Sequence, residues 1–240
     1  PYQDLETSYV AHICLSWEAL HCQYAQLCQK ISCQPINSTC YNHSAQQFQQ
    51  FQVLLQRFIE NEPFEHGLRP EVYARARHML PRLLQVPNIK GADKKEVEEL
   101  ESESMVFAPD LLRLVETSIL TFHLFLKMDK KKPNGVLNLL GDQNQIATHR
   151  QQIQSALEKK SSRLKELCKK RNGWKKKSRP RVYSDIELLF GLIDLKVISR
   201  TLRMAKITKE QLQWCEEKLK KIGVSDGRSR RDPSPALFPC

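Results

Sequence analysis

Two short pairs of side chains have the spacing of metal ligands. Cys40 and His43 form a Cys-x-x-His pair, but a structural zinc site needs a second pair of ligands. Cys28 and Cys33 would have to supply it, with irregular spacing and from the end of a helix. We therefore favour a loop over residues 37–42, with His43 starting the next helix, and predict no metal site.

Glu18 and His21 match half of the Glu-x-x-His pattern of di-iron bundles, which also requires a copy on another helix. The chain has no second copy, so we interpret the pair as part of a solvated face of the first helix. A glycine-rich phosphate loop, a nucleophile elbow and a His-Glu-x-x-His motif are also missing from the sequence. We expect no enzyme activity, no cofactor and no small-molecule substrate. An enzyme would require a deep pocket that joins histidine and carboxylates from separate helices.

The densest charge in the chain is a run of eight basic side chains within thirteen residues. Gly173 and Pro180 should break the helix there, so we expect an exposed connection. Trp174 within this run is suited to stacking on a base or inserting at a membrane interface. Alternatively, the run is only a hydrated loop, and Trp174 packs back on the bundle. The two basic clusters also resemble a nuclear localisation signal. The candidate partner-binding residues are Lys169, Lys170, Arg171, Trp174, Lys175, Lys176, Lys177, Arg179 and Arg181.

Charge divides the 240-residue chain into two halves. Residues 1–126 carry 10 basic and 15 acidic side chains, a net charge of −5, whereas residues 127–240 carry 28 and 12, a net charge of +16. The basic half favours weak, sequence-independent binding to polyanions such as RNA, DNA or an anionic membrane. The densest acidic cluster falls in a segment that we expect to be a mobile linker: Glu96, Glu98, Glu99, Glu101 and Glu103.

Apolar residues recur every three or four positions along most of the chain, which is the period of an α-helix. Only 8 of 240 residues are glycine, which also favours helices over tight β-turns. The stripes predict six or seven helices, with apolar faces over residues 5–31, 48–59, 73–80, 111–125, 146–167, 186–202 and 212–222.

Proline and charged residues modify two of these helices. Pro70 is expected to start the third helix and Pro81 to kink or split it, because proline lacks a backbone donor. The fifth helix has a near-heptad apolar seam, as in a coiled coil, and Arg150 and Lys160 fall on that seam. We therefore expect the seam to be narrow and partly polar.

The last two helices give the clearest local signals. The sixth helix is apolar nearly all round, so we expect it to be central and buried. Thr208 and Gln211 form a capping box that starts the seventh helix, and Gly223 is expected to cap its end.

These elements predict an all-α fold: an irregular bundle of six or seven helices, two of them long, with an acidic linker and a basic loop. We expect one helical domain over residues 1–224, whose subregions 1–87 and 107–224 are joined by the acidic linker 88–106. Residues 225–240 are expected to form an extended C-terminal tail, because they are charged and rich in proline.

Cysteine usage favours an intracellular protein. Five of the eight cysteines lie in the first 40 residues, near glycosylation acceptors at Asn37 and Asn42, which fits secretion. Cys14, Cys22 and Cys28 instead fall in a strongly periodic helix, where thiols pack as small apolar residues. We expect mostly free thiols in the cytoplasm or nucleus. No segment of the sequence has an unbroken apolar run long enough to span a membrane, so we expect any membrane association to use a segment outside this chain.

Several strings resemble one known family over nearly the whole chain. They are Cys14-Leu-Ser-Trp-Glu-Ala-Leu20, residues 46–64, Leu212-Gln-Trp-Cys-Glu-Glu-Lys-Leu219 and the ending Leu237-Phe-Pro-Cys240. The family is plant-restricted and known as domain of unknown function 1666, with a chloroplast-type ribosomal label on some members. The resemblance implies no activity, cofactor or catalytic residue. We expect a non-enzymatic protein-interaction or scaffold domain of a larger plant protein, with an unknown protein partner. The alternative is a basic nucleic-acid- or ribosome-associated protein.

Neutralising Lys175, Lys176 and Lys177 together to Gln should change the free energy of unfolding by no more than about 0.5 kcal/mol, because charges in an exposed connection are already solvated. Urea unfolding of the wild type and the triple variant measures this change. If the run binds polyanions, affinity for RNA should fall with added salt and fall again in the variant. A loss of several kcal/mol would show that the run is buried.

Overall fold

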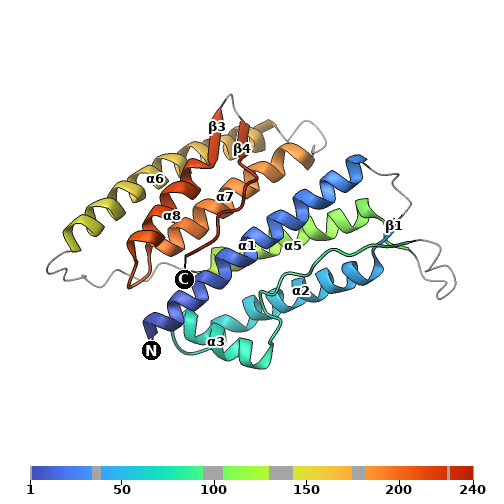
Figure 1. Ribbon diagram of the computed structural model, residues 1–240, viewed down its shortest axis with the longest axis horizontal. Helices are drawn as coiled ribbons and strands as arrows, with labels where there is room; N and C mark the ends of the chain where they lie inside the picture. Colours follow the sequence, from blue (N-terminus) through green and yellow to red (C-terminus); the bar gives the residue numbers. More distant parts are fainter. Residues whose placement is uncertain are drawn as a thin grey trace. The chain divides into compact units, whose positions relative to one another are not determined.

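The computed structural model of the protein describes residues 2–33, 39–93, 105–129, 143–174, 182–225 and 228–239. Helices cover 76% of these residues and the strands among them are short, which confirms the predicted all-α class. The described ranges contain seven α-helices, two of them 32 residues long (Figure 1). The chain divides into two compact units, which we call the terminal unit (Pro1–Ala11 with Asp129–Cys240) and the middle unit (His12–Met128).

Helix α1 (Tyr2–Cys33) begins in the terminal unit and continues in the middle unit. The other elements of the middle unit are β1 (Thr39–Cys40), α2 (Asn42–Asn61), the 3-10 helix η1 (Glu62–Phe64), α3 (Arg69–Met79), β2 (Ala92–Asp93) and α5 (Ala108–Met128). Strands β1 and β2 pair antiparallel, with Thr39 opposite Asp93.

The other elements of the terminal unit are α6 (Gln143–Trp174), α7 (Val182–Leu202), α8 (Lys209–Lys220), β3 (Ile222–Ser225) and β4 (Arg228–Arg231). Strands β3 and β4 form an antiparallel hairpin with Ile222 opposite Arg231. The chain passes from one unit to the other at residues 11 and 12, within α1, and again at residues 128 and 129, whereas we expected two subregions joined by a linker at 88–106. Residues 88–93 of that expected linker are ordered against α1 and α2, and residues 94–104 lie outside the described ranges.

A chain of aromatic rings forms the core of the middle unit. Trp17 of α1 stacks on Phe122 of α5, with ring centroids 6.2 Å apart. Phe58 of α2 lies 5.2 Å from Phe125 of α5 and 6.1 Å from Tyr73 of α3. All five rings are at most 4% exposed, so α1, α2, α3 and α5 share one core. Burial of such large side chains is the dominant favourable term for this unit.

The prediction that Glu18 and His21 lie on a solvated face of α1 was wrong. Each is only 6% exposed, and the His21 ring lies 5.9 Å from the Trp17 ring. Helix α1 is covered from more than one side, because residues 84–89 also pack on it through hydrogen bonds to Ser16 and Gln23. A helix with several neighbours buries polar positions that a single apolar stripe leaves outside.

The cysteines of α1 follow the expected packing only in part. Cys14 is buried, but Cys22 is exposed and Cys28 is half-buried. We expected Cys22 to pack in the core, and it does not. The seven cysteines for which the structure gives a state are free thiols: Cys14, Cys22, Cys28, Cys33, Cys40, Cys168 and Cys215.

Two prolines bracket α3 as predicted. Pro70 lies in the first turn of the helix, and the helix ends at Met79, two residues before Pro81. Residues 81–84 then form a turn, so the apolar stripe does not continue along one helix. Met79, which we expected to pack, is 78% exposed because the helix stops at this residue. The proline therefore decided where the helix ends, as its missing backbone donor requires.

Helix α7 is the buried centre of the terminal unit, which confirms the prediction for the sixth helix. No side chain described between Ile186 and Leu202 is exposed. Asp194, in the middle of α7, is 1% exposed and meets two cations. Its Oδ1 lies 2.8 Å from Nζ of Lys218 on α8, and its Oδ2 lies 2.8 Å from Nε of Arg231 on β4. A buried carboxylate of this kind is tolerated only with such partners.

Arg200, toward the C-terminal end of α7, is a cation paired with two carboxylates, whereas Asp194 is a carboxylate paired with two cations. Its guanidinium lies 2.8 Å from Glu6 Oε1 and 2.9 Å from Asp129 Oδ2. The second oxygen of Glu6 accepts a hydrogen bond of 2.8 Å from the Ala205 backbone. The first turns of α1 are thereby fixed to the end of α7.

The polar seam of α6 has a structural use. Lys160 donates hydrogen bonds to the carbonyl oxygens of Leu219 and Ile222, so it satisfies carbonyls at and just beyond the end of α8. The predicted capping box at the start of α8 is confirmed, since Thr208 and Gln211 satisfy one another's backbone donors. The predicted glycine cap was wrong, because Gly223 is part of β3.

The C-terminal segment is docked rather than a free tail. Trp214 of α8 donates its indole N–H to the Ala236 carbonyl at 3.0 Å, and its ring meets Phe238 edge-on at 5.0 Å. Phe238 is 5% exposed, so the apolar ending that follows the charged residues is the part that packs. Before it, Arg231 of β4 is held by Asp194.

Replacing Asp194 by Ala should lower the free energy of unfolding by about 3–5 kcal/mol, because Lys218 and Arg231 would each lose the buried carboxylate that they contact at 2.8 Å. Lys220→Gln is the matched control: it breaks an ion pair of 2.7 Å whose lysine is 71% exposed, and should cost no more than about 0.5 kcal/mol. Urea unfolding of both variants measures the difference. Equal losses in the two would contradict the structural role of the buried pair.

Candidate functional site

The predicted basic site lies mostly outside the described residues. Lys169 and Lys170 are exposed on α6. The helix continues through Gly173 to Trp174, so the glycine does not end it as we expected. The structure describes no side chain between Arg171 and Arg181, and so it does not test the role of the remaining basic residues.

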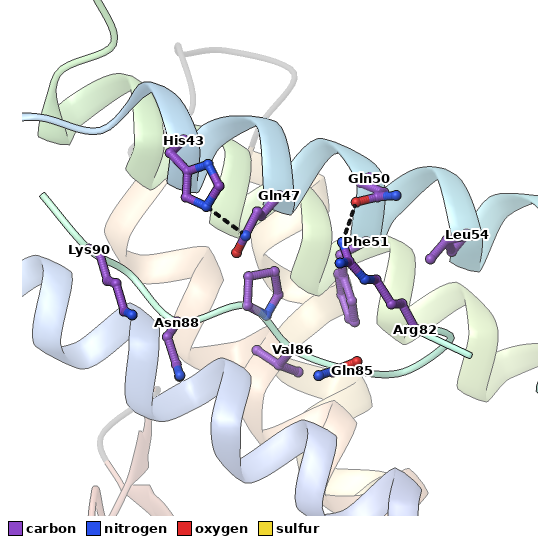
Figure 2. A pocket seen from close by; sticks show the side chains of 11 residues that line it. His43, Gln47, Gln50, Phe51, Leu54, Arg82, Gln85, Val86, Asn88 and Lys90 are labelled. Atoms are coloured by element: carbon purple, nitrogen blue, oxygen red, sulfur yellow. Dashed lines mark hydrogen bonds between the residues drawn. The ribbon is translucent and has the colours of Figure 1, made fainter. Parts of the chain in front are cut away.

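A groove in the middle unit gathers polar side chains that the sequence did not single out. One wall is a stripe of α2 with His43, Gln47 and Gln50, and the opposite wall is the segment 82–90 (Figure 2). The groove has a volume of about 260 Å³. Its residues on α2 recur at helical spacing and so face the same side of the helix.

Hydrogen bonds from α1 and α2 fix the second wall from both sides. Ser16 of α1 donates to the Leu84 carbonyl at 2.6 Å, and Gln23 of α1 accepts from the Ile89 backbone at 2.9 Å. Ser44 of α2 both accepts from the Lys90 backbone N–H and donates to the Lys90 carbonyl, each at 2.9 Å. The backbone of this extended segment is therefore held by side chains. An ordered loop needs such partners, because it has no neighbouring strand to bond its backbone groups.

Leu84 holds the turn at the start of this wall in a strained conformation. Its φ is +64°, in the left-handed region that a branched side chain rarely adopts. The side chain is 1% exposed and Leu83 beside it is fully buried, so packing holds the turn in place. Strain of about 1–3 kcal/mol at such a residue persists only when its surroundings determine it. Arg82 and Gln85 flank this turn and line the groove.

Among the residues that the structure describes, basic groups and amides line the groove and no carboxylate does. His43 and Lys90 lie toward one end and Arg82 toward the other, as Figure 2 shows. Arg82 Nη1 donates to Gln50 Oε1 at 3.3 Å, and Gln47 Nε2 lies 2.8 Å from His43 Nε2. The remaining lining is two further amides and an apolar floor: Gln85, Asn88, Phe51, Leu54, Val86 and Pro87.

The dimensions and chemistry of the groove suit a polypeptide better than a cofactor. Small-molecule sites are commonly about 300–1,000 Å³ and enclose most of the ligand, whereas this groove is smaller and open. Carboxamides carry both donors and acceptors, which match those of a peptide backbone. The glutamine-rich start of α2 was visible in the sequence, but the segment that faces it across the groove was not predictable from spacing.

Cys40 and His43, the pair with metal-ligand spacing, are not brought together as a site within the described ranges. Cys40 is 3% exposed in β1, and its sulfur contacts Asn42 Oδ1 at 3.2 Å, whereas His43 is exposed beside Gln47. In these ranges no group of three His, Cys, Asp or Glu side chains is placed to hold a metal ion. No helix there is both long and apolar enough to cross a membrane.

Two other clusters have shifted pKa values. His12 of α1 lies 2.6 Å from the Tyr73 hydroxyl and also contacts Arg77, and burial followed by the Arg77 charge lowers the pKa of His12 to about 4. Burial also raises the pKa of Tyr73. In the terminal unit, burial raises the pKa of the Cys215 thiol to about 12. These groups are neutral near pH 7, because burial favours the uncharged form of each.

The His12 cluster predicts a loss of stability in mild acid. Folding keeps His12 neutral down to about pH 4, whereas unfolded histidine takes up a proton near pH 6.5, so stability should fall between these values as the pH is lowered. Thermal unfolding at pH 7 and pH 5 measures the change. The His12→Gln variant should lose less stability over this interval than the wild type; an equal loss would show that other groups cause it.

Comparison with known proteins adds a family and no activity. A family model of proteins of unknown function, DUF1666, matches residues 3–239. No curated protein and no solved structure is similar enough to match the chain. The family match extends from the start of α1 to the docked C-terminal segment and therefore includes both units and the groove. This chain belongs to the DUF1666 family of proteins of unknown function.

Proposed function

We propose that the chain is a non-enzymatic protein-interaction domain that holds an extended segment of a partner polypeptide in the groove of the middle unit. The observation that carries the proposal is the fixed backbone of residues 82–90, which is strained at Leu84 and anchored by Ser16 and Ser44. A wall that is ordered before the partner arrives reduces the conformational entropy lost on binding.

The lining supports the choice of a polypeptide. Amide side chains stand on both walls, with Gln47 and Gln50 on α2 and Asn88 on the segment that faces it. A peptide laid between them can both donate to and accept from these groups. Val86 and Pro87 line the groove and are half-buried, and they offer apolar contact to a side chain that enters the groove.

The placement of reactive groups supports a non-enzymatic function. Two of the buried carboxylates, Glu6 and Asp194, are used in ion pairs with cations of the same unit. The thiol of Cys215 is buried and has a raised pKa. The groove itself contains one histidine, His43, and no carboxylate to act with it. General acid–base chemistry ordinarily needs such a partner within hydrogen-bond reach.

A basic nucleic-acid- or ribosome-associated role is the second candidate. The net charge of +16 over residues 127–240 favours it, as do Lys169 and Lys170, which are exposed on α6. Electrostatic binding of this kind would be weak, independent of sequence and sensitive to salt. In either role we propose that the chain works as one part of a larger plant protein.

Filling the groove should abolish peptide binding without unfolding the protein. A display library of random peptides is selected on the 240-residue chain, and the affinity of enriched peptides is measured by fluorescence polarisation. Gln47→Trp should weaken their binding by about tenfold or more, because the indole occupies the groove. Gln56→Trp is the control, since Gln56 is exposed on the opposite side of α2. Failure to enrich any peptide, or equal affinity for both variants, would contradict the proposal.

A further inference from the structure

We propose that the groove selects an acidic segment: an extended peptide with two carboxylates about three residues apart. This inference rests on the proposed function and adds the chemistry of the partner. It starts from the charge of the lining, where His43, Arg82 and Lys90 are the ionisable groups. A groove lined by basic groups without a carboxylate attracts an anionic ligand and disfavours a cationic one.

The two strong cations of the groove are available to a ligand. Within the described residues, neither Arg82 nor Lys90 forms an ion pair, and both side chains are exposed. Arg82 makes one neutral hydrogen bond, to Gln50, which leaves most of its donors for other acceptors. Helix α2 adds no competing charge, because its single acidic residue is Glu60, ten positions beyond Gln50.

The positions of these cations set the spacing of the carboxylates. The backbone of Lys90 is hydrogen-bonded to Ser44, and the side chain of Arg82 is bonded to Gln50. Six residues of α-helix separate these two contacts, a distance of about 9 Å along the helix axis. An extended chain in the polyproline II conformation rises about 3.1 Å per residue with three residues per turn, so its side chains at positions i and i+3 share one face and lie about 9 Å apart. Carboxylates at positions i and i+3 of a peptide in this conformation therefore reach the two ends of the groove.

The middle of the groove suits the chain between the carboxylates. Gln47 and Asn88 stand on opposite walls there, and the apolar floor lies beneath them. Backbone groups of a peptide can bond these amides, while a small apolar side chain contacts Val86 and Pro87, which line the groove and are half-buried. A single nucleic-acid strand would instead need exposed aromatic rings on which bases stack. Phe51 is the one aromatic residue of the lining and is only 2% exposed, so the lining favours a peptide.

The test compares three nine-residue peptides with the full chain by fluorescence polarisation. All are built from Ala, Ser and Val, and they carry Glu, Gln or Lys at positions 4 and 7. The Glu peptide should bind about three to ten times more tightly than the Gln peptide, because two partly solvated ion pairs add only a small binding free energy. Added salt screens these ion pairs, so this difference in affinity should become smaller as the salt concentration rises. The Lys peptide should bind most weakly.

Variants locate the effect in the groove. Lys90→Gln and Arg82→Gln should each reduce the advantage of the Glu peptide over the Gln peptide. Lys127→Gln is the matched control, because Lys127 is exposed on α5 and does not line the groove, and it should leave the advantage unchanged. Thermal unfolding of the variants establishes that they fold.

Each other outcome overturns a definite part of the inference. Equal binding of the Glu and Gln peptides, lost in Gln47→Trp, would overturn the acidic partner and leave the proposed function standing. No binding of any peptide, together with no enrichment from the display library, would overturn both. Tighter binding of a ten-nucleotide uridine RNA than of the Glu peptide, lost in Lys90→Gln and Arg82→Gln, would overturn the peptide in favour of a nucleic acid.

Discussion

The terminal unit depends on one buried charge, that of Asp194. A carboxylate that is 1% exposed keeps its charge only if cations and hydrogen bonds replace the lost water. Lys218 of α8 and Arg231 of the β3–β4 hairpin supply the cations. Because both pair with the same side chain of α7, the Asp194 carboxylate fixes α8 and the hairpin in place. Removing one partner from such an arrangement is costly, because it leaves a buried charge without its counter-charge.

The same requirement, that a buried polar group finds a partner, shapes the groove in the middle unit. The segment from Leu84 to Lys90 has no regular secondary structure, so its backbone groups need partners from elsewhere. Ser16 and Ser44, on α1 and α2, provide them. The result is an extended wall that stands opposite a glutamine-rich helix face. The proposed function follows from this wall, because loops held rigidly on a scaffold can present side chains to a partner with little further ordering.

The groove itself could be predicted from the sequence only in part. The glutamines at the start of α2 and the helical stripe beneath them were visible, and Pro81 predicted the break that begins the opposite wall. The spacing of residues 85–90 gave no sign of where they lie, because an irregular segment has no periodicity. The positive φ of Leu84 was also not predictable from the sequence, because Gly or Asn is the usual residue at such a position. Here the packing of the leucine side chain outweighs that preference.

By itself, the sequence determined the helical class, the charge division, the cap at Thr208 and the end of α3, all of which depend on residues within a few positions of each other. Only the tertiary structure decided which polar residues are buried. Glu18 and His21 lie inside because α1 has neighbours on more than one side. Gly223 is part of a strand because it pairs with Arg230 of β4, and Lys160 from α6 bonds the carbonyls at the end of α8. Local spacing encodes one face of a helix, whereas burial and hydrogen-bond partners depend on segments far apart in the chain.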